Sequence, residues 1–243
     1  MDLLVDADIL ACQFAYAYES SRDGTNTYSD IKETDISDAE WAISGFDSAI
    51  KRMINQTKTK DAILCFTGCN NFRYSILPTY KSNRKGKPKP MLLDILMEHA
   101  WAKWNCKRIE SLEADDIMGI MATDSPGSYI IATIDKDLKQ IPGFHYDWRK
   151  DEVKTIRHPE ADYWFYYQVL TGDSTDGYRG CPGIGVVRAK TVLKGVKFGK
   201  VKSLKKNNSD LKDHLWIRVV RAFESKGLTE EDALIQARVA RLL

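Results

Sequence analysis

The amino-acid sequence predicts an α/β fold, with a mostly parallel central sheet flanked by helices and a helical module at the C-terminal end. Three short runs are apolar on both faces, at Leu3–Val5, Ala62–Phe66 and Tyr129–Ile134, as expected of buried parallel strands. Amphipathic helical patterns lie between these runs at Trp41–Ile54 and Met91–Trp104. Alternation of strands and helices is typical of a parallel sheet covered by helices.

The pattern becomes helical near residue 159 and stays so toward the C-terminus. We therefore expect an α/β domain over 1–158, with a basic segment at about 78–108, and a helical module over 159–243. The helices expected in that module are Glu160–Leu170, Val186–Lys194, Leu211–Glu224 and Thr229–Leu242. Residues 20–38 are polar and rich in turn formers, which predicts a surface loop.

Composition is that of an ordinary globular protein in a reducing compartment. Of 243 residues, 43% are apolar and 29% charged, which excludes a disordered chain. The five cysteines form no C-x-x-C pair, so neither a disulfide framework nor a zinc site is indicated. The acidic N-terminal segment does not resemble a signal peptide, and no stretch approaches 18 apolar residues. We expect a cytoplasmic protein with no membrane partner.

The small net charge of +2 conceals four blocks of alternating sign. Residues 1–72 carry a net charge of −6, residues 73–108 of +7, residues 109–176 of −8 and residues 177–243 of +9. This asymmetry favours a surface that binds a polyanion next to an acidic site. The spacing of the acidic residues indicates what the negative blocks hold.

Acidic residues gather beside the apolar runs. Asp6 and Asp8 follow the first expected strand, and Asp135 and Asp137 follow the third. Ligands of parallel sheets bind at these strand ends. The other clustered acids open a helix or begin the helical module: Glu113, Asp115, Asp116, Asp173 and Asp176. Residues i and i+2 of an extended tail, and i and i+3 of a helix, share a face. This pairs Asp135 with Asp137, Glu113 with Asp116 and Asp173 with Asp176, while Asp115 converges only if the helix begins near it.

Carboxylates crowded at one rim of a sheet repel each other unless cations lie between them. An all-oxygen ligand set favours hard divalent ions, with Mg²⁺ or Mn²⁺ preferred where phosphate completes the shell. Two such ions about 4 Å apart suit phosphodiester hydrolysis. The structural alternative is that an isolated D-x-D caps a turn and that E-A-D-D at a helix start suits the helix dipole. The combination of clusters beside buried strands favours the metal site.

Two further motifs suit contact with phosphate. The segment GCPGIG at 180–185 is a glycine-rich turn before a helix, with Arg188 and Lys190 close behind. Glycines allow close backbone approach, and a helix N-terminus offers free N–H groups to an anion. The +7 block contains Arg73, Tyr80, Lys81, Arg84, Lys85, Lys87 and Lys89. Basic residues around an aromatic ring suit a single strand of nucleic acid, although basic runs also serve as solvated surface.

In chain order, five motifs resemble those of the flap endonuclease family of 5′ nucleases, and of the short phage 5′→3′ exonucleases in particular. They are LLVDAD at 3–8, FRYSILPTYKSNR at 72–84, EADD at 113–116, TIDKDL at 133–138 and GDSTDGYRGCPGIG at 172–185. The resemblance implies a PIN-like nuclease domain followed by a helix–hairpin–helix module that grips duplex DNA. It also implies metal-dependent 5′→3′ exonuclease or flap endonuclease activity on DNA with a 5′ end or flap, with RNA/DNA hybrids as a further candidate substrate, by a monomer.

Carried over motif by motif, the resemblance implies roles for individual residues. Two Mg²⁺, for which Mn²⁺ can substitute, are implied to be held by Asp6, Glu113, Asp115, Asp116, Asp135, Asp137, Asp173 and Asp176. Lys81 and Arg84 are implied to polarise the scissile phosphate. The residues expected to contact DNA are Arg73, Tyr80, Lys85, Gly183, Gly185, Arg188 and Lys190. Relatives commonly bind K⁺ through the backbone carbonyls of the hairpin.

The sequence departs from the family pattern at three points. Many relatives have an aspartate just after the second strand, where this chain has Gly68. Asp8 has no firm counterpart, so its role stays open. The usual P-K-T after G-I-G is V-V-R here, which shifts the expected phosphate contact to Arg188 or Lys190.

Two other functions fit part of the sequence. LLVDADIL resembles the nucleophile motif of a haloacid-dehalogenase-type phosphatase, with Asp6 as nucleophile and Asp8 as acid/base, and GDSTD resembles the last metal motif of that class. That interpretation leaves EADD and the glycine hairpin unexplained. A non-catalytic DNA-binding protein would explain the hairpin and the basic blocks, but not carboxylates that repel DNA in the absence of metal.

Overall fold

The computed structural model describes residues 1–21, 36–84, 86–195 and 208–243, which form two compact units. The first unit comprises Met1–Cys69, Lys87–Asp135 and Gly143–Thr155. The second comprises Asn70–Gly86, Lys136–Pro142 and Ile156–Leu243. The two units are therefore interleaved along the chain, which differs from a single boundary near residue 158, because two short segments ahead of that boundary join the helical unit.

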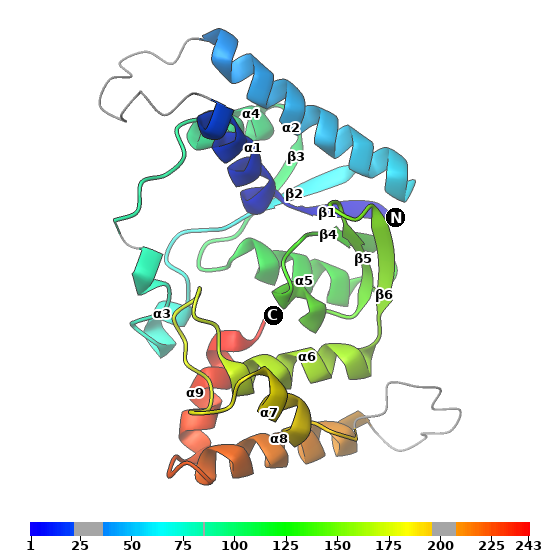
Figure 1. Ribbon diagram of the computed structural model, residues 1–243. Helices are drawn as coiled ribbons and strands as arrows, with labels where there is room; N and C mark the ends of the chain where they lie inside the picture. Colours follow the sequence, from blue (N-terminus) through cyan, green and yellow to red (C-terminus); the bar gives the residue numbers. More distant parts are fainter. Residues whose placement is uncertain (22–35, 85, 196–207) are drawn as a thin grey trace. The chain divides into compact units, whose positions relative to one another are not determined.

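A six-stranded sheet with the order β3-β2-β1-β4-β5-β6 forms the centre of the first unit (Figure 1). The strands are β1 (Asp2–Asp6), β2 (Ala62–Phe66), β3 (Asn105–Arg108), β4 (Tyr129–Ala132), β5 (Gly143–Asp147) and β6 (Glu152–Ile156). Pairings β1–β2, β1–β4, β2–β3 and β4–β5 are all parallel, which confirms the expected mostly parallel sheet. The expected strands correspond to β1, β2 and β4, the last of them ending two residues early.

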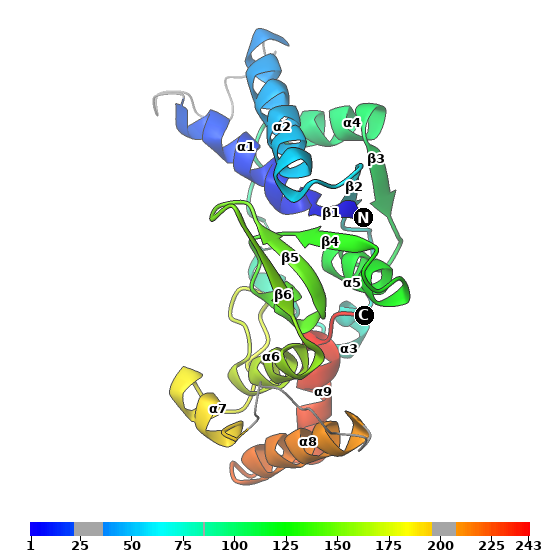
Figure 2. The same cartoon turned by 90° about the vertical axis from the view of Figure 1, so that its right-hand side faces the viewer.

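Among the described residues, the helices that cover this sheet are α1 (Ala7–Ser21), α2 (Ile36–Thr57), α4 (Leu93–Lys103) and α5 (Ala114–Asp124). Helices α1, α2 and α4 contact one another, and α5 contacts strands β1 to β4 on the opposite face (Figure 2). Leu3 and Val5 of β1 pack with Phe46 and Ile50 of α2 in one fully buried core. The helix expected over residues 91–104 is α4, whereas α1 was not expected.

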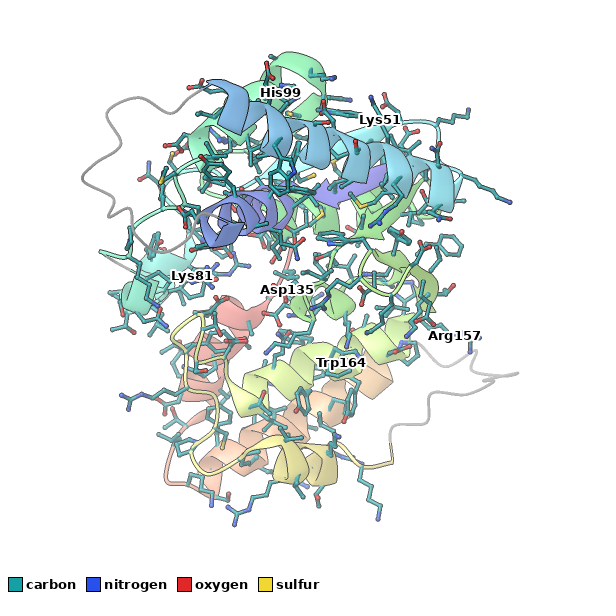
Figure 3. The ribbon with its side chains drawn as sticks, turned by 45° about the horizontal axis from the view of Figure 1, so that its top comes forward. Lys51, Lys81, His99, Asp135, Arg157 and Trp164 are labelled. Atoms are coloured by element: carbon teal, nitrogen blue, oxygen red, sulfur yellow. The ribbon has the colours of Figure 1, made fainter. Side chains whose placement is uncertain are left out.

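Buried Asp47 of α2 fixes the C-terminal end of α4. Its carboxylate accepts hydrogen bonds from Lys103 Nζ at 2.6 Å and from Trp104 Nε1 at 2.7 Å. Nε2 of His99, labelled in Figure 3, lies 3.1 Å from the same carboxylate. Because three side chains from one end of α4 converge on one buried charge, α4 is held firmly against α2.

The second unit is helical, as the sequence predicts. Its elements are α3 (Arg73–Ile76), η1 (Ser82–Arg84), η2 (Asp137–Gln140), α6 (His158–Thr171), α7 (Val186–Val192), α8 (Asn208–Glu224) and α9 (Glu230–Ala240). Leu170, Val219, Phe223 and Ala233 are buried in its core. The expected loop at 20–38 lies largely outside the described residues, and its two ends belong to α1 and α2. Within the described ranges, no helix combines the length and apolar character needed to cross a membrane.

Candidate functional site

Asp6 lies where the two central strands end, and its side chain is only 1% exposed. Thr133, just after β4, donates its hydroxyl to Asp6 Oδ2 at 2.9 Å. The N–H of Asp135 in turn donates to Thr133 Oγ1 at 2.9 Å. From β1 the chain continues toward β2 and from β4 toward β5, on opposite sides. Such a switch point of a parallel sheet is a common place for a ligand site.

Asp8 connects three elements at the same rim. It stands in the first turn of α1, where its Oδ2 accepts the N–H of Thr67 at 2.9 Å. The Thr67 hydroxyl accepts the N–H of Ala114, the first residue of α5, at 3.2 Å. Burial raises the pKa of Asp8 and the charge of Glu113 adds to this rise, while Thr67 and Arg108 oppose it. Asp8, whose role the sequence left open, thus belongs to the carboxylate cluster of the first unit.

The E-A-D-D motif begins α5 with a reciprocal cap. Asp116 Oδ2 accepts the N–H of Glu113 at 3.1 Å, while the Glu113 side chain caps the N–H of Asp116. This is the structural role that such a motif can have at a helix start. It also fixes both carboxylates at the rim, where they are buried, whereas Asp115 is half-buried.

Cys65 shows how closely the carboxylates gather. It is the register partner of Asp6 on β2 and is fully buried. Burial raises the pKa of its thiol, and the charges of Asp6, Asp8 and Asp115 raise it further. Carboxylates from β1, α1 and α5 therefore act on one buried side chain.

The electrostatics of Asp6 suit a bound cation. Burial raises its pKa to about 7; Asp8 and Asp135 add to the rise, and the Thr133 hydroxyl opposes it. A cation bound beside Asp6 would favour the ionised form of this carboxylate. Oxygen donors of this kind suit a hard divalent ion. Within the part of the chain that the structure describes, no three Asp, Glu, His or Cys side chains are arranged to hold a metal ion. The donor set thus fits a divalent metal in chemistry and charge, without a preformed cage.

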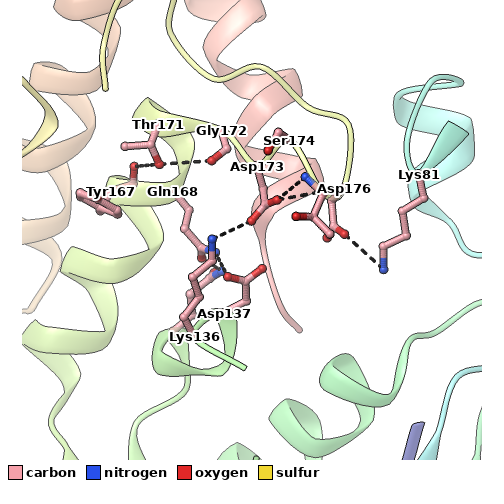
Figure 4. Close-up of polar contacts among 12 residues, drawn as sticks. Lys81, Lys136, Asp137, Tyr167, Gln168, Thr171, Gly172, Asp173, Ser174 and Asp176 are labelled. Carbon is pink, nitrogen blue, oxygen red and sulfur yellow. Dashed lines mark hydrogen bonds and ion pairs between the residues drawn. The ribbon is translucent and has the colours of Figure 1, made fainter. Parts of the chain in front are cut away.

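In the second unit, Asp173 and Asp176 lie in a tight turn (Figure 4). The turn is closed by backbone hydrogen bonds between Asp173 and Tyr178. Asp173 Oδ1 accepts the N–H groups of Thr175 at 2.7 Å and of Asp176 at 3.3 Å. The expectation that this pair shares a helix face is wrong, because α6 ends at Thr171 and the chain turns; the turn itself brings the two residues together.

In the second unit, Lys136 forms an ion pair with Asp173 and Gln168 forms a hydrogen bond with Asp137. Lys136 Nζ lies 2.9 Å from Asp173 Oδ2. Burial opposes ionisation of Asp173, but this ammonium and the turn N–H groups outweigh it and hold the pKa of Asp173 below its usual range. Asp137 Oδ1 accepts Gln168 Nε2 at 2.5 Å. The expected extended tail that pairs Asp135 with Asp137 is not found, because Asp137 begins the η2 turn.

The Y-K-S-N-R segment is built around Asp176. Arg84 Nη2 lies 2.6 Å and Lys81 Nζ 3.7 Å from Asp176 Oδ1, and the N–H of Lys81 donates to the Asp176 carbonyl at 2.8 Å. Asn83 Nδ2 donates to the carbonyls of Ser174 and Thr175. The structure therefore brings the predicted phosphate-polarising residues and one predicted metal ligand into a single cluster.

Two residues predicted to contact DNA are buried instead. Arg73 is 1% exposed; its Nε donates to the carbonyl of Val239 at 2.8 Å and its Nη2 to that of Arg241 at 2.7 Å. Tyr80 is 2% exposed, and its hydroxyl donates to Asp176 at 3.2 Å. Both side chains are packed in the core of the helical unit, and no contact of either with DNA is proposed below.

The glycine hairpin leads into α7 as expected. Gly185 is the N-cap of α7, and Arg188 Nη1 donates back to the carbonyl of Gly183 at 2.7 Å. Lys190 is exposed on α7. Lys85, another expected DNA contact, lies outside the described residues.

Five polar residues that contact acidic residues, or the turn that carries them, in one unit or the other were not assigned roles from the sequence: Thr67 and Thr133 in the first unit, and Asn83, Lys136 and Gln168 in the second. Asn83, Thr133 and Lys136 lie inside the motifs that resemble the family. Their position in those motifs could have indicated that they support the functional residues. Thr67 and Gln168 offered no such signal.

Gly68 has a steric reason to be glycine. A Cβ atom there would lie 2.1 Å from the carbonyl oxygen of Ile109, and its N–H donates to the Leu112 carbonyl at 2.8 Å. This backbone therefore has no room for the aspartate that many relatives carry at the position.

Comparison with known proteins gives consistent results. Residues 2–161 match the family described as the 5′-3′ exonuclease, N-terminal resolvase-like domain. The exonuclease of Escherichia phage T7 is 32% identical over 208 residues, an alignment that covers 74% of this chain and 68% of that protein. The zinc-bound structure of the phage T5 5′-exonuclease superposes with a TM-score of 0.61 at 15% identity, covering 99% of this chain and 97% of that one. A phage T5 flap endonuclease in complex with DNA and metal ions gives a TM-score of 0.58, also at 15% identity, covering 98% of each chain.

Proposed function

The chain belongs to the 5′–3′ exonuclease family and is a 5′ nuclease, and from that premise we propose which metal, substrate and residues serve its reaction. The substrate we propose is DNA, cleaved from or near a 5′ end or flap. This proposal is supported mainly by the carboxylate cluster around Asp6, where burial and the charges of Asp8 and Asp135 raise the pKa of Asp6 to about 7.

We assign divalent metal binding to two sets of carboxylates, with Mg²⁺ as the ion and Mn²⁺ as its substitute. The proposed ligands are Asp6, Glu113, Asp115, Asp116 and Asp135 in the first unit and Asp137, Asp173 and Asp176 in the second. Bound there, such ions supply the positive charge that activates water and stabilises the leaving 3′ oxygen. Thr133 holds the Asp6 carboxylate in place, and Lys136 and Gln168 do the same for Asp173 and Asp137.

Lys81 and Arg84 are proposed to bind the scissile phosphate. Both cations share the carboxylate of Asp176, so they stand beside a proposed metal ligand. An ammonium and a guanidinium held there can contact the non-bridging phosphate oxygens and stabilise the charge that develops on them. The Asn83 bonds to the turn keep the segment that carries both cations in position.

The hairpin is proposed to bind the phosphate backbone without regard to sequence. Gly183, Gly185, Arg188 and Lys190 are the proposed contacts, supported by exposed basic side chains beside the start of α7. K⁺ bound by hairpin carbonyls is a further proposal. We also propose that the protein acts as a monomer in the host cytoplasm and accepts RNA/DNA hybrids; the phage origin of the relatives named above supports the location.

The test is a polarity assay. Duplexes labelled at either the 5′ or the 3′ end, together with a 5′ flap and an RNA/DNA hybrid, are incubated with the protein in Mg²⁺. We expect short products from the 5′ label before any shortening reaches the 3′ label. Shortening that begins at the 3′ end would contradict the proposal. Phosphate release from a small phosphomonoester, without DNA cleavage, would favour the phosphatase alternative instead.

A further inference from the structure

Three flat side chains meet at the carboxyl ends of β2 and β3 in the first unit. Phe66 and Arg108, the last residues of these strands, are register partners, so their side chains leave the sheet on the same face. The Trp101 ring of α4 stacks on Phe66 with centroids 6.0 Å apart and planes at 27°. The Arg108 guanidinium lies 5.6 Å from the centre of the same indole ring. The indole therefore contacts both neighbours.

Trp101 is exposed although its position is fixed. The residue is 44% exposed, while the buried Phe66 ring supports it from the sheet. The helix that carries it is anchored two and three residues further on, where Lys103 and Trp104 bind buried Asp47. A large ring with a fixed orientation loses little conformational entropy when a second flat group stacks on it.

This aromatic cluster adjoins the carboxylates. The residue after Phe66 is Thr67, whose N–H binds Asp8 at 2.9 Å and whose hydroxyl accepts the N–H of Ala114 at the start of α5. Arg108 is exposed, and its charge stabilises the ionised form of Asp8. The ring and the guanidinium are thus linked through Thr67 and Asp8 to the rim where α5 begins.

We propose that Trp101 and Arg108 form a nucleotide subsite, in which an unpaired base of the DNA strand stacks on the indole and an adjacent phosphate binds the guanidinium. The inference rests on the proposed function and names a part of the substrate: an unpaired nucleotide near the cleaved bond. Stacking on an aromatic ring is available to every base, so the subsite does not select sequence. It selects unpaired nucleotides, because a base inside a duplex has no free face.

The test measures stacking directly. Single-stranded overhangs carrying 2-aminopurine at successive positions are mixed with the protein in Ca²⁺ in place of Mg²⁺, with the DNA checked to be uncut. We expect quenching of 2-aminopurine fluorescence at one or two positions, and its loss in Trp101→Ala. Affinity for the overhang should fall about five- to tenfold, while affinity for a blunt duplex stays unchanged. Trp101→Phe should retain part of both effects.

Two further variants make the result specific. Trp41→Ala removes a similarly exposed indole from α2 of the same unit and should leave the quenching unchanged. Arg108→Gln should weaken overhang binding and reduce the dependence of log affinity on log salt by about one phosphate contact. Unchanged quenching in Trp101→Ala, or an equal loss of affinity for the blunt duplex, would overturn the inference. Failure of the wild-type protein to cleave DNA in Mg²⁺ is a separate result that concerns the proposed function.

Discussion

The carboxylate of Asp6 is held where water cannot solvate it, and its protonation should govern the stability of the metal-free protein. Burial raises its pKa to about 7, whereas the unfolded chain keeps a pKa near 4. Between those values the folded state binds a proton that the unfolded state has lost. The free energy of unfolding should therefore fall as pH rises from about 4 to 7 and stay low above that.

We expect Asp6→Asn to remove this fall and to be more stable than the wild type at pH 8 without metal. Urea denaturation in EDTA at pH 5 and pH 8 measures both quantities. Added Mg²⁺ should stabilise the wild type at pH 8 and leave the variant nearly unchanged. An equal loss of stability with pH in both proteins would show that Asp6 is not the titrating group.

Lys81 should affect rate more than binding. Its ammonium lies 3.7 Å from Asp176, beside a proposed metal ligand, so its charge acts where the transition state gains charge. We expect Lys81→Ala to lose about 10²-fold in kcat with little change in affinity for DNA. Lys87→Ala, which removes an exposed lysine from the same basic block, serves as the control. The reverse pattern, weak binding at normal rate, would make Lys81 a binding residue only.

Gly68 should not tolerate any side chain. Because a Cβ atom at this position would lie 2.1 Å from the Ile109 carbonyl oxygen, the loop must move to admit one, and Gly68→Ala should lose about 1 to 3 kcal/mol of stability. Cys69→Ala is the matched control, since it shortens an exposed side chain at the next residue of the same loop. Chemical denaturation compares the two. Equal stability of Gly68→Ala and the wild type would contradict the steric explanation.

The role of a residue could be predicted from the sequence where its charge and its position beside a strand are enough to indicate it. Asp6 and Asp135 stand at strand ends, and their charge and position indicate a cation. Arg73 and Tyr80 share the same basic block as Lys81, yet tertiary packing buries the first two and leaves the third half-buried. Burial of a single side chain depends on what folds over it, which local sequence does not show.

At the scale of elements, β1, β2 and β4 were predictable from the sequence, whereas β3, β5 and β6 were not. β1, β2 and β4 are apolar on both faces because helices cover both. β3 has the sequence NCKR, and β6 is exposed over most of its length, so neither shows the apolar signal of a strand. Helix α1 was not predicted for another reason. Asp8 lies in its first turn, but in the sequence this residue looks like part of an extended tail after the first strand.

The end of α9 should depend on Arg73. Its guanidinium satisfies the carbonyls of Val239 and Arg241 in a buried place, and removing the donor leaves those carbonyls without their partner. We expect Arg73→Met to lose about 2 to 4 kcal/mol of stability. Arg238→Met, at an exposed arginine of the same helix, should lose less than about 0.5 kcal/mol. Similar losses for both in urea denaturation would contradict this role.

At the scale of the whole molecule, the alternating charge blocks indicate a polyanion partner and an acidic site, which the net charge of +2 does not. Lys81 and Arg84 come from a positive block and Asp176 from a negative one, and the second unit joins them in one cluster. The division into units could not be predicted as a single boundary, because residues 70–86 and 136–142 fold with the helical unit. Contacts distant in sequence decide that assignment.

The carboxylates beside β1 and β4 should make DNA cleavage depend on a divalent metal. The most direct measurement is cleavage of a 5′-labelled duplex by the wild type in Mg²⁺ and in EDTA, and by Asp135→Ala in Mg²⁺, with Asp124→Ala as the control at an exposed acid of α5. We predict cleavage only by the wild type and the control in Mg²⁺, with DNA binding retained in Asp135→Ala. Cleavage in EDTA, or undiminished cleavage by Asp135→Ala, would contradict the claim.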